Sequence, residues 1–177
     1  MAFYEDTVEV MLGAEQIQKR IAELGAQITA DYRGKDLTLV GIMKGSIFFL
    51  TDLARHVDLP CTIELMGVSS YQGGTETTGE VRVTHDVTKP MHGRHVLLVE
   101  DIVDTGLTMK FLLDNMNARN PASVKVATLL EKPSRAKVKV TIDYKGFVIE
   151  DRFVVGYGLD YGEKYRNLPF VGVLRTD

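Results

Sequence analysis

The sequence of 177 residues contains a single cysteine, so no disulfide can form within the chain. Such sparse use of cysteine suits a reducing compartment, and we expect the protein to be cytoplasmic. The one thiol, Cys61, follows Pro60 and opens an apolar alternation, which favours a small residue of the core over a nucleophile. The sequence thus gives no indication of disulfide or thiol chemistry.

Long apolar runs and an excess of basic residues are also missing. The longest apolar runs, such as IFFL at 47–50, fall far short of the roughly 20 residues that span a bilayer. Residues 1–10 carry early acids and no hydrophobic segment, so we expect no signal peptide. With 21 basic against 24 acidic residues and a formal net charge of −3, the composition is not that of a nucleic-acid binder. We therefore expect neither a membrane nor a nucleic acid as a partner.

No repeat, low-complexity tract or Pro/Ser-rich linker divides the chain, so we predict a single domain over residues 1–177. Apolar periodicity indicates helices at 14–32, 47–57 and 106–119. Short apolar or alternating runs indicate strands at 36–42, 61–68, 81–86, 95–101 and 124–131, followed by a β-rich tail at 141–161. This alternation predicts an α/β fold with a central, mostly parallel sheet flanked by helices.

Polar clusters follow three of the predicted strands: Lys44-Gly45-Ser46, residues 100–108, and Glu131-Lys132. Because ligands of parallel sheets bind at the carboxyl ends of the strands, these clusters predict one binding site. The first cluster hints at a nucleotide P-loop, but the upstream glycine spacing of that motif is absent, which excludes it. The polar, glycine-rich stretch 69–80 is either a functional lid or a plain surface insertion, and its composition favours neither.

The stretch VLLVEDIVDTGLT at 96–108 crowds three carboxylates at the end of an apolar run. Glu100 and Asp101 end a strand, where their oxygens suit vicinal hydroxyls or a hard cation that would offset their repulsion. The turn Asp104–Thr108 leads into a helix, whose first amides, a glycine and two threonine hydroxyls suit a phosphate. Ordinary helix capping explains the threonines equally well when they are considered alone.

This stretch resembles the phosphoribosyl-pyrophosphate motif of the type I phosphoribosyltransferases, which is long and specific. Within that group the chain is most similar to the hypoxanthine-guanine phosphoribosyltransferases, and the match runs nearly end to end. It includes GIMKGSIFFLTDL at 41–53, SSYQGG at 69–74, LLEKP at 129–133 and DRFVVGYGLDYGEKYRNLP at 151–169. The resemblance implies a core over roughly 14–135 and a small hood from 1–13 and 136–177. It also implies purine salvage, in which a 6-oxopurine and phosphoribosyl pyrophosphate give IMP or GMP and pyrophosphate.

The resemblance further implies a role for individual residues. Asp104 would be the general base or acid at the purine N7. The 5′-phosphate would bind Asp104, Thr105, Gly106, Leu107 and Thr108. Glu100 and Asp101 would meet the ribose hydroxyls near a Mg²⁺ ion, and Asp160 would serve a second Mg²⁺. The purine would contact Lys132 through its O6, Phe153 by stacking, Val154 through the backbone, and the region of Asp160.

Pyrophosphate would contact Lys44, Gly45 and Arg166, and the Met43-Lys44 peptide would be cis. Ser70 and Tyr71 would form the covering pair of a mobile loop. A homodimer or homotetramer is expected by the same resemblance.

Several of these residues have simpler explanations when each is considered alone. Lys132 could be a surface lysine, Phe153 a core residue and Asp160 the cap of a turn. The joint match of five segments in order favours the enzyme. Two alternatives stay open: a sister enzyme that prefers xanthine or guanine, and a nucleotide-sensing regulator of the same fold. Asp104 argues against the regulator, since a sensor needs no base at that position.

Overall fold

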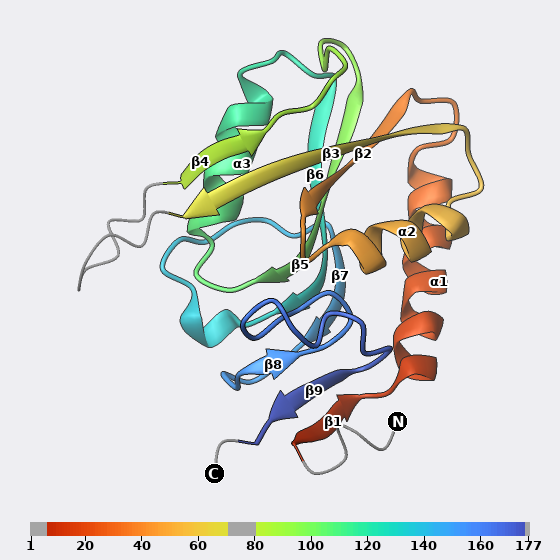
Figure 1. The fold of residues 1–177 in the computed structure, drawn as a ribbon. Coiled ribbons are helices and arrows are strands. Elements are labelled where there is room, and N and C mark those ends of the chain that lie inside the picture. Colours follow the sequence, from red (N-terminus) through yellow and green to blue (C-terminus); the bar gives the residue numbers. More distant parts are fainter. Residues whose placement is uncertain (1–6, 71–80, 176–177) are drawn as a thin grey trace.

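The computed structural model describes residues 7–70 and 81–175, which form two β-sheets and three α-helices (Figure 1). The elements follow one another as β1 (Val8–Leu12), α1 (Ala14–Asp31), β2 (Leu37–Met43), α2 (Ile47–His56), β3 (Cys61–Ser70), β4 (Val81–His85), β5 (His95–Val103), α3 (Leu107–Asn117), β6 (Ser123–Glu131), a 3₁₀ turn (Pro133–Arg135), β7 (Tyr144–Val148), β8 (Val154–Val155) and β9 (Val171–Leu174). The predicted helices and strands are thus present, with ends that differ by a few residues.

The large sheet has the strand order β4-β3-β2-β5-β6-β7. All neighbours in it are parallel except β4, which runs antiparallel to β3. Strand β2 is buried along its whole length up to Met43, as its unbroken apolar run predicts. The predicted central, mostly parallel sheet is confirmed, and the carboxyl ends of β2, β5 and β6 lie side by side at one edge.

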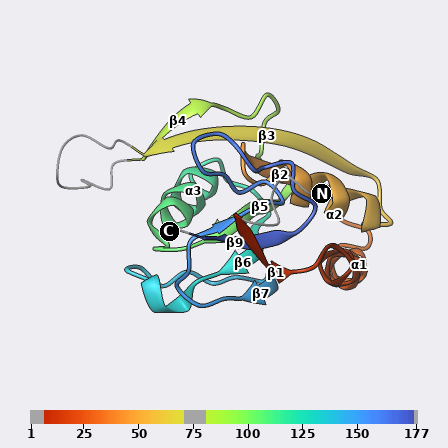
Figure 2. The ribbon, with the colours of Figure 1, turned by 60° about the horizontal axis from the view of Figure 1, so that its bottom comes forward.

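The helices cover both faces of this sheet, with α1 and α2 on one side and α3 on the other (Figures 1 and 2). Alternate residues of one strand enter different cores: Leu97 packs with α1 and α2, whereas Leu98 packs with α3. Cys61 is partly buried against the first core, as predicted, and burial raises the pKa of its thiol. No helix in the described ranges is long and apolar enough to cross a membrane.

A small antiparallel sheet of order β1-β9-β8 lies below the large sheet in Figure 1 and forms the hood. Its strands come from both ends of the chain, as predicted. The boundary at residue 135 was placed too early, because β7 pairs with β6 in the large sheet although its sequence lies in the segment assigned to the hood. The apolar alternation of the tail does not distinguish a strand that extends one sheet from a strand that begins another.

Candidate active site at the carboxyl edge of the sheet

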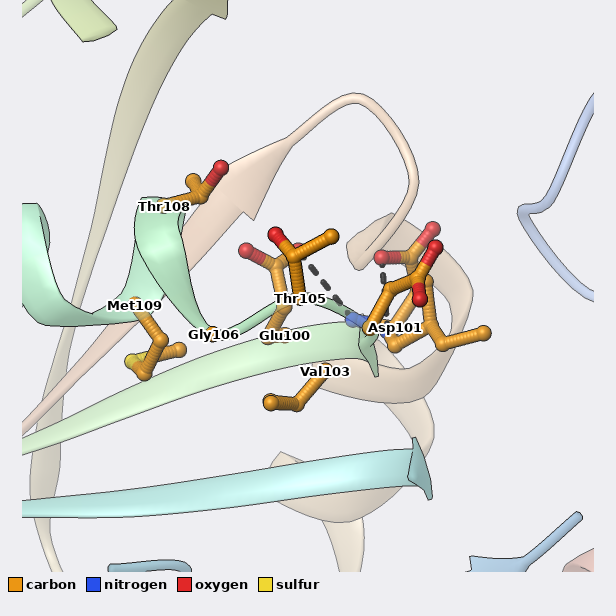
Figure 3. Close-up of a pocket in the computed structure, with 9 residues that line it drawn as sticks. Glu100, Asp101, Val103, Thr105, Gly106, Thr108 and Met109 are labelled. Carbon is orange, nitrogen blue, oxygen red and sulfur yellow. Dashed lines mark hydrogen bonds between the residues drawn. The ribbon is translucent and has the colours of Figure 1, made fainter. Parts of the chain in front are cut away.

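Glu100 and Asp101 lie near the end of β5, where they line a cavity of about 320 Å³ (Figure 3). Glu100 is buried with 8% of its surface exposed, whereas Asp101 is partly exposed. Burial, and then the negative charge of Asp101, raise the pKa of Glu100 well above its usual value. Burial also raises the pKa of Asp101. Two adjacent carboxylates, one of them buried, favour a proton or a cation beside them, so this site suits a hard metal ion.

The β5–α3 turn (residues 104–108) supplies the rest of this cavity together with the first turn of α3 (Figure 3). Gly106 precedes the helix with φ 81°, a left-handed conformation that disfavours side chains. A Cβ at Gly106 would also overlap the carbonyl oxygen of Val138. The Thr105 carbonyl accepts hydrogen bonds from the amides of Lys137 and Val138, at 2.9 and 3.1 Å. The turn is therefore fixed by backbone contacts. The first turn of α3 borders the cavity, and its leading amide, that of Leu107, donates to Oγ1 of Thr105 at 3.4 Å. A helix N-terminus at a cavity suits an anion.

Asp104 lies where this cavity meets two neighbouring ones, since it lines all three. Its Oδ1 atom accepts a hydrogen bond of 2.7 Å from Nε of Arg135, in the 3₁₀ turn after β6. Arg135 also lies 3.5 Å from Asp151, whose carboxylate is 3.7 Å from Nζ of Lys132. A chain of alternating charges thus joins the candidate base to the candidate purine lysine.

Lys132 and Phe153 line a second cavity, of about 510 Å³, which shares Asp101 and Asp104 with the first. Lys132 is 8% exposed, and its amide donates to the carbonyl of Val103 at 3.0 Å, which fixes the end of β6 beside the end of β5. A surface lysine is therefore excluded. Phe153 is 54% exposed and meets Tyr161 edge to face, so it is not a core residue either. An exposed ring and a buried ammonium group at one cavity suit a planar heterocycle with an acceptor oxygen.

Lys44 and Gly45 follow β2. Gly45 lies against Asp101, and both residues meet the hood loop (residues 156–168). The Met43-Lys44 peptide is cis, as predicted. A Cβ at Gly45 would overlap the Asp101 carboxylate, and a Cβ at Gly158 would overlap the Gly45 carbonyl oxygen. Both glycines therefore permit a close approach of the hood loop to the sheet edge.

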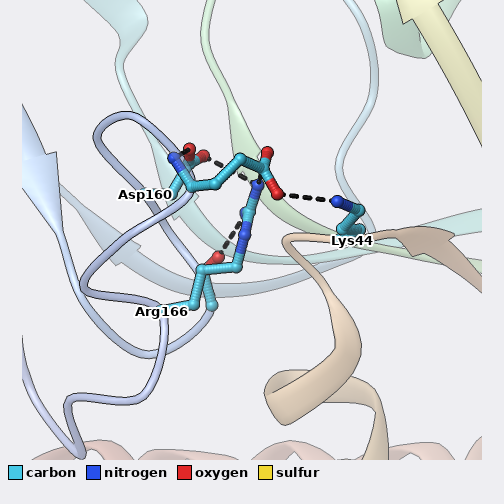
Figure 4. A network of polar contacts seen from close by, with 5 residues as sticks. Lys44, Asp160 and Arg166 are labelled. Carbon is cyan, nitrogen blue, oxygen red and sulfur yellow. Dashed lines mark hydrogen bonds and ion pairs between the residues drawn. The ribbon is translucent and has the colours of Figure 1, made fainter.

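Arg166 joins this group through the hood loop, where it donates to the carbonyl of Gly158 at 2.7 Å and pairs with Asp160 at 3.0 Å (Figure 4). Glu163 completes the network as a carboxylate between Lys44 and Arg166, at 2.6 and 3.0 Å. The hydrogen bond from Lys44, and then that from Arg166, lower the pKa of Glu163. Two candidate pyrophosphate residues far apart in the sequence thus share one anionic partner.

Asp160, the candidate ligand of a second metal ion, lines the second cavity beside Phe153 and Val154. Its Oδ2 atom accepts the amide of Glu163 at 2.8 Å, which is also how a carboxylate caps a turn. Within the described ranges, no group of three or more His, Cys, Asp or Glu residues could hold a metal ion. A metal ion here would therefore depend on two carboxylates at a time, with oxygens of a ligand and water completing its coordination, as is common for Mg²⁺.

The structure brings together the candidate residues from 44, 45, 100–108, 132, 153, 154, 160 and 166 at one edge of the large sheet. Of the candidate covering pair, Tyr71 and the side chain of Ser70 lie outside the described residues. Sequence reasoning missed Arg135, Asp151 and Glu163. For Arg135, the sequence Lys132-Pro-Ser-Arg135 was the only indication. A turn that begins at Pro133 brings Arg135 back toward the end of the strand.

Comparison with known proteins accounts for this arrangement. Residues 11–162 match the family model described as the phosphoribosyl transferase domain. The hypoxanthine-guanine phosphoribosyltransferase of Streptococcus pneumoniae strain R6 is 50% identical over 97% of this chain and 96% of its own length. That of Mycobacterium bovis is 51% identical over 96% and 87%. A crystal structure of a hypoxanthine phosphoribosyltransferase from Staphylococcus aureus superposes with a TM-score of 0.94 at 47% identity, covering 99% of this chain and 95% of that one. The chain therefore belongs to the phosphoribosyltransferase family, among the hypoxanthine-guanine phosphoribosyltransferases.

Proposed function

We propose that this enzyme transfers the 5-phosphoribosyl group from phosphoribosyl pyrophosphate to hypoxanthine and guanine, giving IMP or GMP and pyrophosphate. The observation that carries the proposal is the meeting of two cavities at Asp104. One has the anion-binding turn and paired acids that suit a phosphorylated sugar, and the other has the buried Lys132 and exposed Phe153 that suit an oxopurine. A base and a sugar phosphate bound in these cavities would meet beside the Asp104 carboxylate.

The sugar phosphate occupies the first cavity in this proposal. The amides and hydroxyls of the β5–α3 turn, including Leu107 through its backbone, bind the 5′-phosphate at the start of α3. Glu100 and Asp101 bind the ribose hydroxyls. Transfer breaks the C1′–oxygen bond to pyrophosphate and forms the bond from C1′ to N9 of the base, while positive charge develops on the ribose.

The purine occupies the second cavity. Phe153 stacks on the ring, Val154 contacts it through the backbone, and Lys132 donates a hydrogen bond to O6. Asp104 accepts the proton that leaves N7 as N9 bonds to the sugar. Adenine carries an amino group instead of O6, so Lys132 would find no acceptor there. Sites that use a buried polar contact in this way discriminate by roughly 10⁴-fold or more.

Pyrophosphate departs toward Lys44, Gly45 and Arg166, whose two positive charges favour the leaving anion. The raised pKa of Glu100 beside Asp101 fits a Mg²⁺ ion at these two carboxylates, and Asp160 offers oxygens for a second one. When bound, Mg²⁺ offsets the negative charge of the pyrophosphate group. Ser70 and Tyr71 are proposed to cover the site, because a ribosyl cation would otherwise react with water.

A panel of four bases tests the proposal: hypoxanthine, guanine, xanthine and adenine, each with phosphoribosyl pyrophosphate and Mg²⁺. We expect turnover of hypoxanthine and guanine, none of adenine, and loss of activity in excess chelator. A preference for xanthine would favour the sister enzyme, since O6 alone does not separate these three oxopurines. Binding of a nucleotide without turnover of any base would favour the regulator and overturn the proposal.

The assembly and the compartment are part of the proposal. We expect a homodimer or homotetramer in the cytoplasm. Light scattering behind size-exclusion chromatography measures the mass of the particle, and a monomer at working concentrations would contradict this expectation.

A further inference from the structure

The Glu163 carboxylate occupies the place between two cations to which the proposed function assigns pyrophosphate. Its Oε2 atom accepts from Nζ of Lys44 at 2.6 Å, and its Oε1 atom accepts from Nη2 of Arg166 at 3.0 Å. The side chains of Glu163 and Lys44 are 64% and 68% exposed. A contact of this kind is reached by solvent and exchanges readily for another anion.

The backbone holds Glu163 in this place independently of the two ion pairs. The residue has φ 65°, and its amide donates to Oδ2 of Asp160 at 2.8 Å. The hood loop therefore presents the carboxylate toward the end of β2, where Lys44 lies (Figure 4). The same loop positions Arg166. The hood therefore contributes both a cation for pyrophosphate, Arg166, and the anion that pairs with this cation, Glu163.

The three side-chain nitrogens of Arg166 differ in their partners, which shows the nitrogen for which Glu163 and a diphosphate would compete. Nε is buried and has no hydrogen-bond partner among residues 7–70 and 81–175, and Nη1 donates to the carbonyl of Gly158 within the hood loop. Nη2 pairs with Asp160 and Glu163. Nη2 is thus the nitrogen that binds carboxylates here, and an incoming diphosphate that uses it meets Glu163 there.

We propose that Glu163 is an intramolecular competitor of the diphosphate group, and the inference rests on the proposed function. Its carboxylate neutralises Lys44 and Arg166 until the diphosphate of the substrate replaces it, and it returns to the same cations as pyrophosphate leaves. Glu163 therefore weakens the binding of diphosphate and speeds its exchange. It acts on affinity for the diphosphate and leaves the affinity for the base unchanged.

The test compares wild type with Glu163→Gln, which keeps the shape of the side chain and removes its charge. Titration calorimetry measures the affinity for inorganic pyrophosphate with Mg²⁺, and initial rates give KM for phosphoribosyl pyrophosphate and for hypoxanthine. We expect pyrophosphate to bind about three- to tenfold more tightly to the variant, because two exposed ion pairs of this kind contribute modestly. KM for phosphoribosyl pyrophosphate should fall to a similar extent, and KM for hypoxanthine should stay constant.

Glu23→Gln is the matched control, since Glu23 is half-exposed on α1 and also pairs with an arginine, Arg20. It removes the same charge away from the site and should leave the pyrophosphate affinity unchanged. Equal or weaker binding of pyrophosphate to Glu163→Gln would overturn the proposal, and weaker binding would show that Glu163 holds the cations ready instead. Should this variant unfold, Glu163→Ala provides the same comparison. A wild type that neither binds pyrophosphate nor turns over a 6-oxopurine would contradict the proposed function, whereas failure confined to the variant contradicts only the role of Glu163.

Discussion

The β5–α3 turn and the hood loop face the same site but present different groups to it. The turn continues a buried strand, its Thr105 carbonyl is fixed by two amides, and the carboxylate of Glu100 next to it is buried. Backbone hydrogen bonds also hold the hood loop, such as those from Tyr157 to Leu168 and from Gly158 to Arg166. The side chains that it brings to the site are paired charges: Arg166 pairs with Asp160 and Glu163, and Glu163 also pairs with Lys44 after β2. Both halves of the site thus have a fixed backbone, but the turn offers buried groups and backbone amides, whereas the hood loop offers exposed charges whose partners a ligand can replace. Substitutions should therefore have large effects in the turn and small, salt-dependent effects in the hood.

The largest effect is expected for Asp104→Asn in the turn. The amide keeps the shape of the side chain but does not accept a proton, so kcat should fall by about 10²- to 10⁴-fold, or roughly 3–5 kcal/mol in barrier. Binding of phosphoribosyl pyrophosphate should persist, because in the proposed function the backbone of the turn would provide most of the phosphate contacts. Single-turnover rates and substrate titrations measure the two quantities separately. An unchanged kcat would rule out proton transfer by Asp104.

Asp151→Asn is the matched change on the hood side of Arg135, which contacts both carboxylates. Asp151 is half-exposed and lies 3.7 Å from Lys132. We expect kcat to change by no more than about fivefold, because exposed ion pairs contribute little. A loss of kcat as large as that of Asp104→Asn would show that the turn and the hood do not differ in their sensitivity to substitution.

Gly106→Ala tests the rigidity of the turn against a glycine elsewhere. Gly106 and Gly93 have similar left-handed φ values of 81° and 72°, but a Cβ meets nothing within 4 Å at Gly93 and overlaps the Val138 carbonyl at Gly106. Gly93→Ala should cost about 1 kcal/mol of unfolding free energy, whereas Gly106→Ala should cost about 2–3 kcal/mol and weaken phosphate binding. Denaturant titration of both variants measures the difference. Equal losses would mean that the turn adjusts freely.

Much of this contrast follows from how sequence encodes each region. The apolar run before Glu100 and the glycine and threonines after it predict a strand, a turn and a helix within consecutive residues, and the structure has all three. The strand, turn and helix that form this part of the candidate site were predictable because their determinants are local.

The charge pairs of the other half could not be predicted in the same way. Lys44 and Glu163 are 119 positions apart, and their contact depends on the packing of the hood loop against the end of β2. Arg135 and Asp151 look like ordinary surface charges in the sequence. The 3₁₀ turn after β6 places Arg135 at Asp104, and the pairing of β7 with β6 brings Asp151 near Lys132. Likewise, the resemblance placed β7 in the hood, and the alternating pattern of residues 141–161 gives no indication that β7 pairs with β6 instead.

Glu100→Gln should stabilise the protein while it reduces activity. Burial, and then the negative charge of Asp101, raise the pKa of Glu100, so its ionised form is less favourable in the folded protein than in the unfolded chain. Replacing it by a neutral amide should add about 1–2 kcal/mol, or roughly 2–8 °C in Tm. Mg²⁺ should raise the Tm of wild type more than that of the variant. Glu150→Gln, an exposed change, serves as the control and should leave Tm constant. A lower Tm for Glu100→Gln would show that the charge is compensated without a cation.

The smallest effect is expected for Arg135→Gln, which connects the two regions through Asp104 and Asp151. Arg135 is exposed, so its pairs are screened by water and ions, and we expect kcat for hypoxanthine to change by only about two- to fivefold. The dependence of kcat on salt distinguishes an exposed ion pair from a rigidly held one. In about 1 M salt, where the screening length falls to about 3 Å, wild type and variant should converge. Steady-state rates across a salt series measure this convergence. A large loss of kcat that persists at high salt would show that Arg135 behaves like the residues of the turn and not like those of the hood. Only a rigidly held partner of Asp104 would resist screening by salt.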